Sequence, residues 1–139
     1  SLRLEKGYRA WAGEINTETN PYEAGLGFAV SLKKENFHGK AAAVAAQANL
    51  TRKLVAITFD DITCVPFGSE PIRIGEKIVG RIKSGGQGYT IKKAIAYAYL
   101  PIAQTEVGTK VDVEFFGTWR SGVICAEPLF DPSNERIRC

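Results

Sequence analysis

The sequence contains no methionine, one histidine and three cysteines that lie far apart, at Cys64, Cys125 and Cys139. No Cys-x-x-Cys pair occurs, and His38 has no neighbour of the kind that ligates metals, so the spacing of a zinc or redox site is lacking. We therefore expect no metal site, and free thiols in a reducing compartment, the cytoplasm. Cys125 stands in an apolar stretch and is expected to be a small core residue.

Long hydrophobic runs and an excess of one charge are also lacking. The longest apolar candidate, 94–100, is stopped by Pro101 and falls well short of the ~18 residues that a membrane span needs. The chain carries 18 basic and 15 acidic residues, mixed along its length, for a net charge of +3. A nucleic-acid-binding protein would show a basic patch. We expect neither a membrane nor a nucleic-acid partner.

The length of 139 residues suffices for one hydrophobic core and a small appendage. Because methionine is absent, we do not expect Ser1 to be a translational start. We expect the chain to be a fragment, or a processed C-terminal portion, of a longer protein.

From Thr51 onward the sequence shows short runs in which apolar and polar residues alternate, separated by glycine turns. This period of two is typical of half-buried strands. The runs are 53–59, 71–74, 77–82, 93–100, 110–116 and 119–126. Gly75 and Glu76 join the second and third runs as a hairpin turn. Six such strands predict a mainly β fold, an antiparallel barrel or sandwich, because closure removes exposed edges.

The first fifty residues follow a different pattern. Residues 2–6 are expected to form the end of a helix that stops at Gly7, and 22–27 one helical turn. Residues 28–32 are expected to form a short strand. The alanine-rich run 39–48 has high helix propensity, with Asn49 as its end. We therefore divide the chain into two domains, 1–50 and 51–139.

Several motifs occur in a fixed order along the chain. Leu2-Arg3-Leu4-Glu5 is followed by Gly7, then by Trp11, and the run 20–26 reads Asn-Pro-Tyr-Glu-Ala-Gly-Leu. The remaining motifs are Phe37-x-Gly39-Lys40, Val79-Gly80 and Ser84-Gly85-Gly86. Together they resemble the folate-dependent aminomethyltransferase family, which includes the T-protein of glycine cleavage, and the related C-terminal halves of dimethylglycine and sarcosine dehydrogenases. The ending 127–132 is similar to the dehydrogenase branch.

This resemblance implies a six-stranded antiparallel Greek-key barrel, preceded by a short helical and irregular segment that is left from the folate-binding domain. The implied reaction moves a one-carbon unit from an aminomethyl or N-methylglycine-type donor to tetrahydrofolate. FAD would belong to an upstream domain outside this sequence. The family's catalytic aspartate lies in the larger N-terminal domain, so we assign no catalytic residue, and we expect the fragment to be inactive alone. The implied partners are that upstream domain and a small amine substrate.

Three residues are candidates for folate binding. A pterin stacks on aromatic side chains, and its glutamate tail attracts basic groups. The resemblance places Tyr8 against the folate, and Arg3 and Trp11 lie nearby in the sequence. Each has a structural alternative: Tyr8 packs between domains, Arg3 with Glu5 anchors the helix, and Trp11 is core or interface.

Three local features and one alternative function complete the predictions from the sequence. Ala12 stands where the family usually has glycine, so the local backbone is in question. The segment 84–88 is expected to be a glycine loop that permits a close approach. Tyr97 and Tyr99 share a strand face, and their neighbours in the sequence are alanines, which favours packing over nucleic-acid binding. The alternative function is a non-enzymatic barrel used as a binding or interaction module, with self-association through an exposed aromatic face of Tyr8, Trp11 and Phe28.

Overall fold

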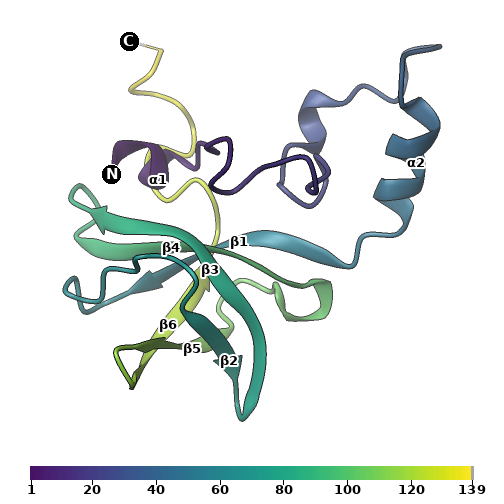
Figure 1. The fold of residues 1–139 in the computed structure, drawn as a ribbon. Coiled ribbons are helices and arrows are strands. Elements are labelled where there is room, and N and C mark those ends of the chain that lie inside the picture. The colour runs from purple at the N-terminus through teal and green to yellow at the C-terminus, as the bar shows by residue number, and fades with distance from the viewer. Residues whose placement is uncertain (139) are drawn as a thin grey trace.

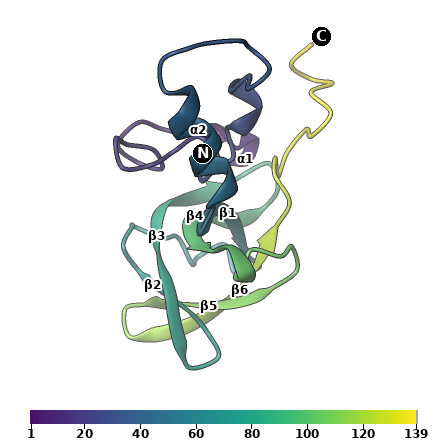
Figure 2. The same ribbon diagram turned by 90° about the vertical axis from the view of Figure 1, so that its right-hand side faces the viewer.

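The computed structural model describes residues 1–138 and consists of a closed antiparallel barrel with a layer of helices and loops on one side (Figures 1 and 2). Around the barrel the strand order is β1-β4-β3-β2-β5-β6. The strands are β1 (Arg52–Phe59), β2 (Pro71–Ile74), β3 (Lys77–Gly88), β4 (Lys93–Pro101), β5 (Lys110–Phe115) and β6 (Thr118–Cys125). The predicted mainly β fold with a six-stranded barrel is confirmed.

The connectivity is that of a Greek key. β2, β3 and β4 follow one another as antiparallel neighbours, and β4 then pairs with β1 in a register that runs from Arg52 opposite Pro101 to Phe59 opposite Ala94. β6 returns to β1 at Ala56 opposite Cys125, which closes the barrel. The β2–β3 hairpin turns at Gly75, whose φ of 60° lies in the left-handed region that glycine adopts without strain.

The barrel interior is filled by side chains of alternating strand positions, as the period of two predicts. Val111, Val113 and Phe115 of β5 point inward as expected. Phe115 meets Phe59 of β1 edge to face, with ring centroids 5.6 Å apart. This cluster is the main hydrophobic core of the chain.

A second core lies on the outer face of β1 and β4, where the N-terminal segment covers the barrel. It comprises Leu4, Leu54, Ala56, Ile95, Tyr97 and Tyr99. The Tyr97 hydroxyl donates to the carbonyl of Leu4 at 2.8 Å, and the Tyr99 hydroxyl donates to the carbonyl of Glu14 at 2.9 Å. The predicted packing role of the two tyrosines is confirmed, and β1 and β4 are buried on both faces.

The N-terminal segment holds one short helix and several turns. α1 (Leu2–Lys6) ends at Gly7, whose φ of 76° confirms the predicted left-handed stop. Ala12 has a φ of 67°, so it keeps a conformation that favours glycine. The strand predicted for residues 28–32 is wrong: residues 27–29 form a 3-10 helix, η1 (Gly27–Ala29), because no strand edge is available beside them.

We predicted that the glycine run 84–88 is a loop. This prediction is wrong, because the run forms the second half of the long strand β3. A methyl group added at Gly85 would lie 2.6 Å from Pro66, and one added at Gly86 would lie 2.9 Å from Leu4 of α1. The glycines therefore serve the close approach that we expected, but they do so within a strand.

The predicted alanine-rich helix is confirmed as α2 (Lys40–Ala48), and the Asn49 side chain donates to the carbonyl of Ala45 at 2.8 Å. None of its residues is buried. In Figure 1 it stands apart from the barrel, to the right of β1. A final 3-10 turn, η2 (Ile102–Gln104), follows β4.

The C-terminal tail is less free than its polar sequence suggests. The Asp131 carboxylate lies 3.1 Å from Lys6 Nζ, and its side chain is 6% exposed.

The two cysteines within the described residues differ in burial. Cys64 is buried and unpaired. Cys125 is only partly buried, so the expectation that Cys125 is a core residue is wrong. Cys139 lies outside the described residues. Within residues 1–138, no helix is both long and apolar enough to cross a membrane.

Candidate functional site

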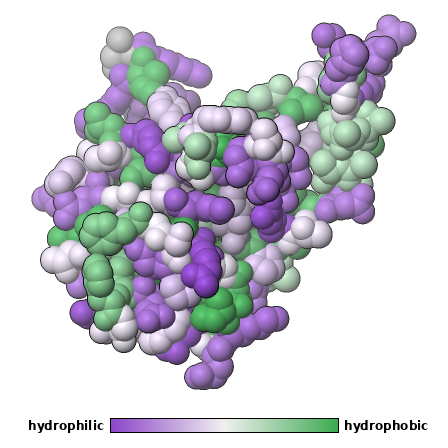
Figure 3. Space-filling view, in the orientation of Figure 1, coloured by the Kyte–Doolittle hydropathy of each residue, from purple (hydrophilic) through white to green (hydrophobic). Residues whose placement is uncertain are grey.

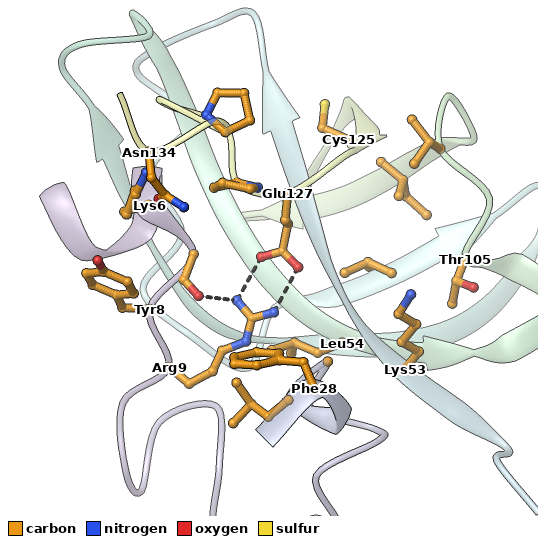
Figure 4. Close-up of a pocket in the computed structure, with 18 residues that line it drawn as sticks. Lys6, Tyr8, Arg9, Phe28, Lys53, Leu54, Thr105, Cys125, Glu127 and Asn134 are labelled. Atoms are coloured by element: carbon orange, nitrogen blue, oxygen red, sulfur yellow. Dashed lines mark hydrogen bonds and ion pairs between the residues drawn. The ribbon is translucent and has the colours of Figure 1, made fainter. Parts of the chain in front are cut away.

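A cavity of about 790 Å³ lies where the N-terminal segment, the start of β1, the end of β6 and the C-terminal tail meet (Figure 4). Its volume falls in the range of sites that bind small molecules. Apolar side chains from all four elements form much of its surface. Its polar and aromatic lining residues are Lys6, Tyr8, Arg9, Phe28, Lys53, Thr105, Cys125, Glu127 and Asn134.

An ion pair between Arg9 and Glu127 crosses the middle of this cavity (Figure 4). Both guanidinium nitrogens reach the carboxylate, at 2.7 and 2.8 Å, and the same guanidinium donates to the carbonyls of Gly7 and Ala24. The two side chains are 8% and 22% exposed. Burial alone would lower the pKa of Arg9, but the hydrogen bond and charge of Glu127 raise it overall. Arg9 therefore stays charged, and the pair ties the first residues to the segment after β6.

The Arg9 guanidinium also lies over the Tyr97 ring, 5.2 Å from its centroid. Burial raises the pKa of Tyr97 far above its ordinary value, and the nearby Glu127 carboxylate acts in the same direction. Tyr97 thus stays a neutral hydrogen-bond donor to the Leu4 carbonyl. It belongs to the second core beneath Arg9 and keeps its proton at neutral pH.

Tyr8 and Lys53 occupy different sides of the cavity. Figure 4 shows Tyr8 on one side of the ion pair and Lys53 with Thr105 on the other. Tyr8 is 55% and Phe28 87% exposed, so both rings offer free faces. Lys6 and Arg9 are each paired with a carboxylate, but Lys53 has no carboxylate within salt-bridge distance among residues 1–138. An elongated ligand with an aromatic end and an anionic end matches this layout.

The structure places the candidate Tyr8 in the cavity and the candidate Arg3 outside it. The Arg3 guanidinium donates to both carboxylate oxygens of Glu14, at 2.9 and 3.0 Å, and to the carbonyl of Tyr8 at 3.2 Å. Arg3 therefore fixes the backbone that presents Tyr8. Its anchoring role is confirmed, and its contact with folate stays a prediction.

Glu14 is the centre of this anchor. Its side chain is 0% exposed and accepts hydrogen bonds from Arg3, from the Ser84 hydroxyl of β3 and from the backbone of Ala10. Burial alone would raise the pKa of Glu14, but the bond from Ser84, followed by those from Ala10 and Arg3, lowers it overall. The carboxylate thus stays ionised between α1 and the barrel.

Trp11 does not line the cavity, and its side chain is 68% exposed. We expected Trp11 to be a core or an interface residue: its exposure shows that the core half of this expectation is wrong, and the interface half stays a prediction. Whether Trp11 contacts folate stays a prediction.

Glu5 anchors the other end of α1. It is 1% exposed, and its Oε1 atom accepts hydrogen bonds from the backbone amides of Thr90 at 2.7 Å and Ile91 at 3.3 Å. The predicted anchoring of the helix to a neighbouring loop is confirmed. Its Oε2 atom is buried without a hydrogen-bond partner among the described residues.

Our sequence reasoning missed Arg9, Lys53 and Glu127 as cavity residues. Arg9 and Glu127 are 118 positions apart, and a pairing at that separation depends on the closed barrel. The available signals were that Arg9 follows the candidate Tyr8 and that Glu127 opens the ending 127–132, whereas nothing in the sequence marked Lys53.

Comparison with known families agrees with this architecture. The family model described as the glycine cleavage T-protein C-terminal barrel domain matches residues 52–131, which is more than half of the chain. A second model, the GCVT N-terminal domain, matches residues 1–34. The chain therefore belongs to the glycine cleavage T-protein family.

Individual relatives refine this assignment. The chain is 42% identical to the mitochondrial dimethylglycine dehydrogenase of Homo sapiens, over 99% of this chain and 16% of that protein. It is 38% identical to an aminomethyltransferase of Symbiobacterium thermophilum, over 98% of this chain and 36% of that protein. A crystal structure of the glycine cleavage system aminomethyltransferase T from Bartonella henselae superposes with a TM-score of 0.86 at 26% identity, over 94% of this chain and 37% of that one. The chain thus spans between a sixth and two fifths of the length of these relatives.

Proposed function

We propose that this chain is the C-terminal portion of a folate-dependent aminomethyltransferase, in which it forms one wall of the folate site. The observation that carries the proposal is the cavity between the two matched segments, with Tyr8 from the first and Lys53 from the second. A site built at the junction of two domains is a common position for a ligand pocket.

The layout of the cavity supports one orientation of tetrahydrofolate. Tyr8 and Phe28 offer aromatic faces for the flat pterin. Lys53, whose charge is unpaired among the described residues, attracts the carboxylates of the glutamate tail. The Arg9–Glu127 pair lies between them and has no net charge, so it holds the two sides of the cavity together without competing for the tail.

Tetrahydrofolate would supply two nitrogens that take up the methylene carbon: an iminium donor would leave as its amine with release of a proton, and an aminomethyl donor would leave as ammonia and the protonated group that carried it. The residues of this chain bind and orient, because the carboxylate in the described lining of the cavity, Glu127, is held by Arg9 and is not available as a base. The carboxylate that the family uses near the folate nitrogen would come from the upstream domain. The 139-residue chain alone should therefore not turn over substrate.

The finer proposal is that the parent protein is a dimethylglycine or sarcosine dehydrogenase-like oxidoreductase, in which an upstream FAD domain delivers the one-carbon donor. The identity of 42% to a dimethylglycine dehydrogenase, against 38% to an aminomethyltransferase, supports this branch. The amine substrate would then be an N-methylated glycine.

The test is calorimetric titration with tetrahydrofolate of the 139-residue chain and of the product of its full reading frame. We expect binding by the longer protein, and about tenfold weaker binding after Tyr8→Ala, which is the usual effect of removing one stacking ring. Tyr89→Ala is the matched control, because Tyr89 is 68% exposed and lies outside the cavity.

If the full product binds no folate, the proposal is wrong, and the alternative of a barrel used as an interaction module takes its place. If folate binds with equal affinity to the Tyr8→Ala and Tyr89→Ala proteins, the function stands but the cavity is not the site.

A further inference from the structure

Two exposed phenylalanines meet at the end of the barrel that lies away from the cavity. Phe67, in the loop between β1 and β2, is 81% exposed, and Phe116, in the turn between β5 and β6, is 91% exposed. Their rings stand edge to face, with centroids 5.9 Å apart and an interplanar angle of 73°. Two aromatic rings left almost entirely in water forgo the stabilisation that burial gives, so their position calls for an explanation.

A concavity of about 480 Å³ opens beside the two rings. Its lining residues, which we call the aromatic corner, are Phe67, Glu70, Phe115 and Phe116. Phe115 is 9% exposed and packs edge to face on Phe59, so it forms a fixed floor. Figure 3 shows hydrophobic side chains, in green, at the lower left of the barrel, where the β5–β6 turn lies in Figure 1. The corner thus offers three aromatic rings around one space.

The backbone of the β5–β6 turn is unusual for an aromatic residue. Phe116 has a φ of 48°, in the left-handed region, where a bulky side chain is an outlier. Two-residue turns with positive φ at both positions, as at 116–117, favour asparagine, aspartate or glycine at the first position. Backbone strain of this kind collects at functional sites. The chain keeps an exposed ring where a small polar residue would suit the turn better.

The loop that carries Phe67 is fixed on two sides. The Glu70 carboxylate accepts hydrogen bonds from the backbone amides of Phe67 at 2.7 Å and Gly68 at 2.8 Å. The Ser69 amide donates to the carbonyl of Ile82 in β3 at 2.8 Å. A site that is already formed loses little conformational entropy when a ligand binds. The aromatic corner is therefore a preformed feature of the barrel.

The charge of the aromatic corner selects a cation. Its described lining contains one charged side chain, the carboxylate of Glu70. The faces of aromatic rings carry negative potential, so the rings and this carboxylate attract a cation together. The amides of Phe67 and Gly68 already donate to Glu70, so they are not free to hold an anion.

The hydrogen bonds of Glu70 decide which kind of cation fits. Each of its two carboxylate oxygens already accepts a backbone N–H, and the phenyl rings offer no strong acceptor. A head group with N–H donors would lose its hydration here without gaining equal partners. A quaternary ammonium group has no N–H, and its methyl groups pack on aromatic faces.

We propose that the aromatic corner binds the quaternary ammonium group of a small free molecule, through cation–π contacts with Phe67 and Phe116 and the charge of Glu70. The closed barrel pairs each strand on both sides, so it offers no strand edge to hold the backbone of a peptide ligand. The proposal does not rest on folate binding. The corner lies before the start of β6 and the cavity at its end, so either site can fail without the other.

The probe is choline, and the matched control ligand is its neutral isostere, in which carbon replaces the nitrogen. Saturation-transfer NMR on the full reading-frame product should give a dissociation constant for choline of about 1–10 mM. The isostere has the same shape without the charge and should bind about tenfold more weakly. Equal affinities would overturn the proposal, because they would show an apolar patch that does not select a cation.

Variants assign the binding to the corner. Phe116→Leu and Phe67→Leu, on two separate loops, keep apolar bulk but remove a ring, and each should weaken choline binding about threefold. Tyr89→Leu is the control, because Tyr89 is 68% exposed and lies outside the corner. Phe116→Trp should strengthen binding, since indole is the best cation–π partner, and a damaged fold would not produce that gain.

Two results would overturn the assignment. Choline binding that is unchanged in both leucine variants would place the cation elsewhere. A peptide with trimethyllysine that binds more than about tenfold tighter than choline, and loses that affinity in Phe116→Leu, would assign the corner to a protein partner instead of a free molecule.

Discussion

Arg9 and Glu127 are joined by two parallel hydrogen bonds of 2.7 and 2.8 Å, although 118 residues separate them. Arg9 follows α1 in the N-terminal segment, and Glu127 follows the last strand of the barrel. The pair therefore connects the segment matched by the N-terminal family model to the barrel matched by the C-terminal one. In the cavity it lies between Tyr8 and Lys53 (Figure 4).

Removing the charge of Glu127 should be costly. Glu127→Gln leaves the Arg9 guanidinium, which is 8% exposed, without a counterion, and loss of one partner of a buried pair typically lowers the free energy of unfolding by about 3 kcal/mol. The control is Asp60→Asn in the exposed Lys93–Asp60 pair, for which we expect less than about 1 kcal/mol. Urea unfolding measures both, and equal losses would show that the cavity pair adds no more than a surface pair.

Acid should weaken the attachment of the N-terminal segment through Glu14. The pKa of this carboxyl is lower in the folded chain than its unfolded value of about 4.3, so folding favours the ionised form. The stability that it adds is complete above that unfolded value and is lost as the pH falls through the folded pKa. Urea unfolding between pH 7 and pH 3 should therefore show a smaller acid-induced loss in Glu14→Gln than in the unaltered chain.

The matched control for that measurement is Glu76→Gln, because Glu76 is exposed in the β2–β3 turn. Its acid-induced loss should equal that of the unaltered chain. If Glu14→Gln also retains the full loss, the hydrogen bonds from Ser84 and Arg3 are not the cause of the acid sensitivity.

Replacing Ala12 by glycine should stabilise the chain. The left-handed backbone at Ala12, with a φ of 67°, costs an L-residue about 1 kcal/mol or more, and glycine adopts it freely. Because glycine also gains entropy in the unfolded state, the net rise in unfolding free energy should be under about 1 kcal/mol. Ala10→Gly, two residues earlier and outside the positive-φ positions, should destabilise instead. Thermal unfolding shows whether each variant is more or less stable than the unaltered chain. A loss of stability in both variants would contradict the strain at Ala12.

Lys53 should strengthen the binding of folates through their glutamate tail. In the full reading-frame product, Lys53→Gln should weaken binding of a polyglutamylated tetrahydrofolate and leave binding of a free tetrahydropterin unchanged, because the pterin end lies toward Tyr8. The effect should shrink at high salt, since exposed charges are screened. Lys110→Gln, at an exposed position on β5 outside the cavity, is the control. An equal loss for both ligands would place the tail elsewhere.

The strands were predictable because a barrel strand carries its own signal. In β5 the alternation of Val111, Asp112 and Val113 specifies which side chains face the core, whatever the neighbouring strands are. The glycine run failed because glycine marks both loops and sites of close contact. Only the position of Leu4 against Gly86 shows that contact is the reason here.

The site was predictable in part. Tyr8 followed from the resemblance, and the structure places it in the cavity. Arg3 belongs to the right segment, but its guanidinium is directed to Glu14, a partner eleven residues away in an irregular turn. Side-chain direction in such a turn depends on which charges the fold brings within reach, and no periodicity encodes it.

The sequence by itself determined the barrel, the helix α2 and the family, because alternation, helix propensity and ordered motifs act over short stretches of chain. Only the tertiary structure decided that Arg9 meets Glu127, that Glu5 and Glu14 are buried against the barrel and that Trp11 is exposed. These features arise when barrel closure brings distant strands together. A charge is buried only where a specific partner offsets its loss of hydration.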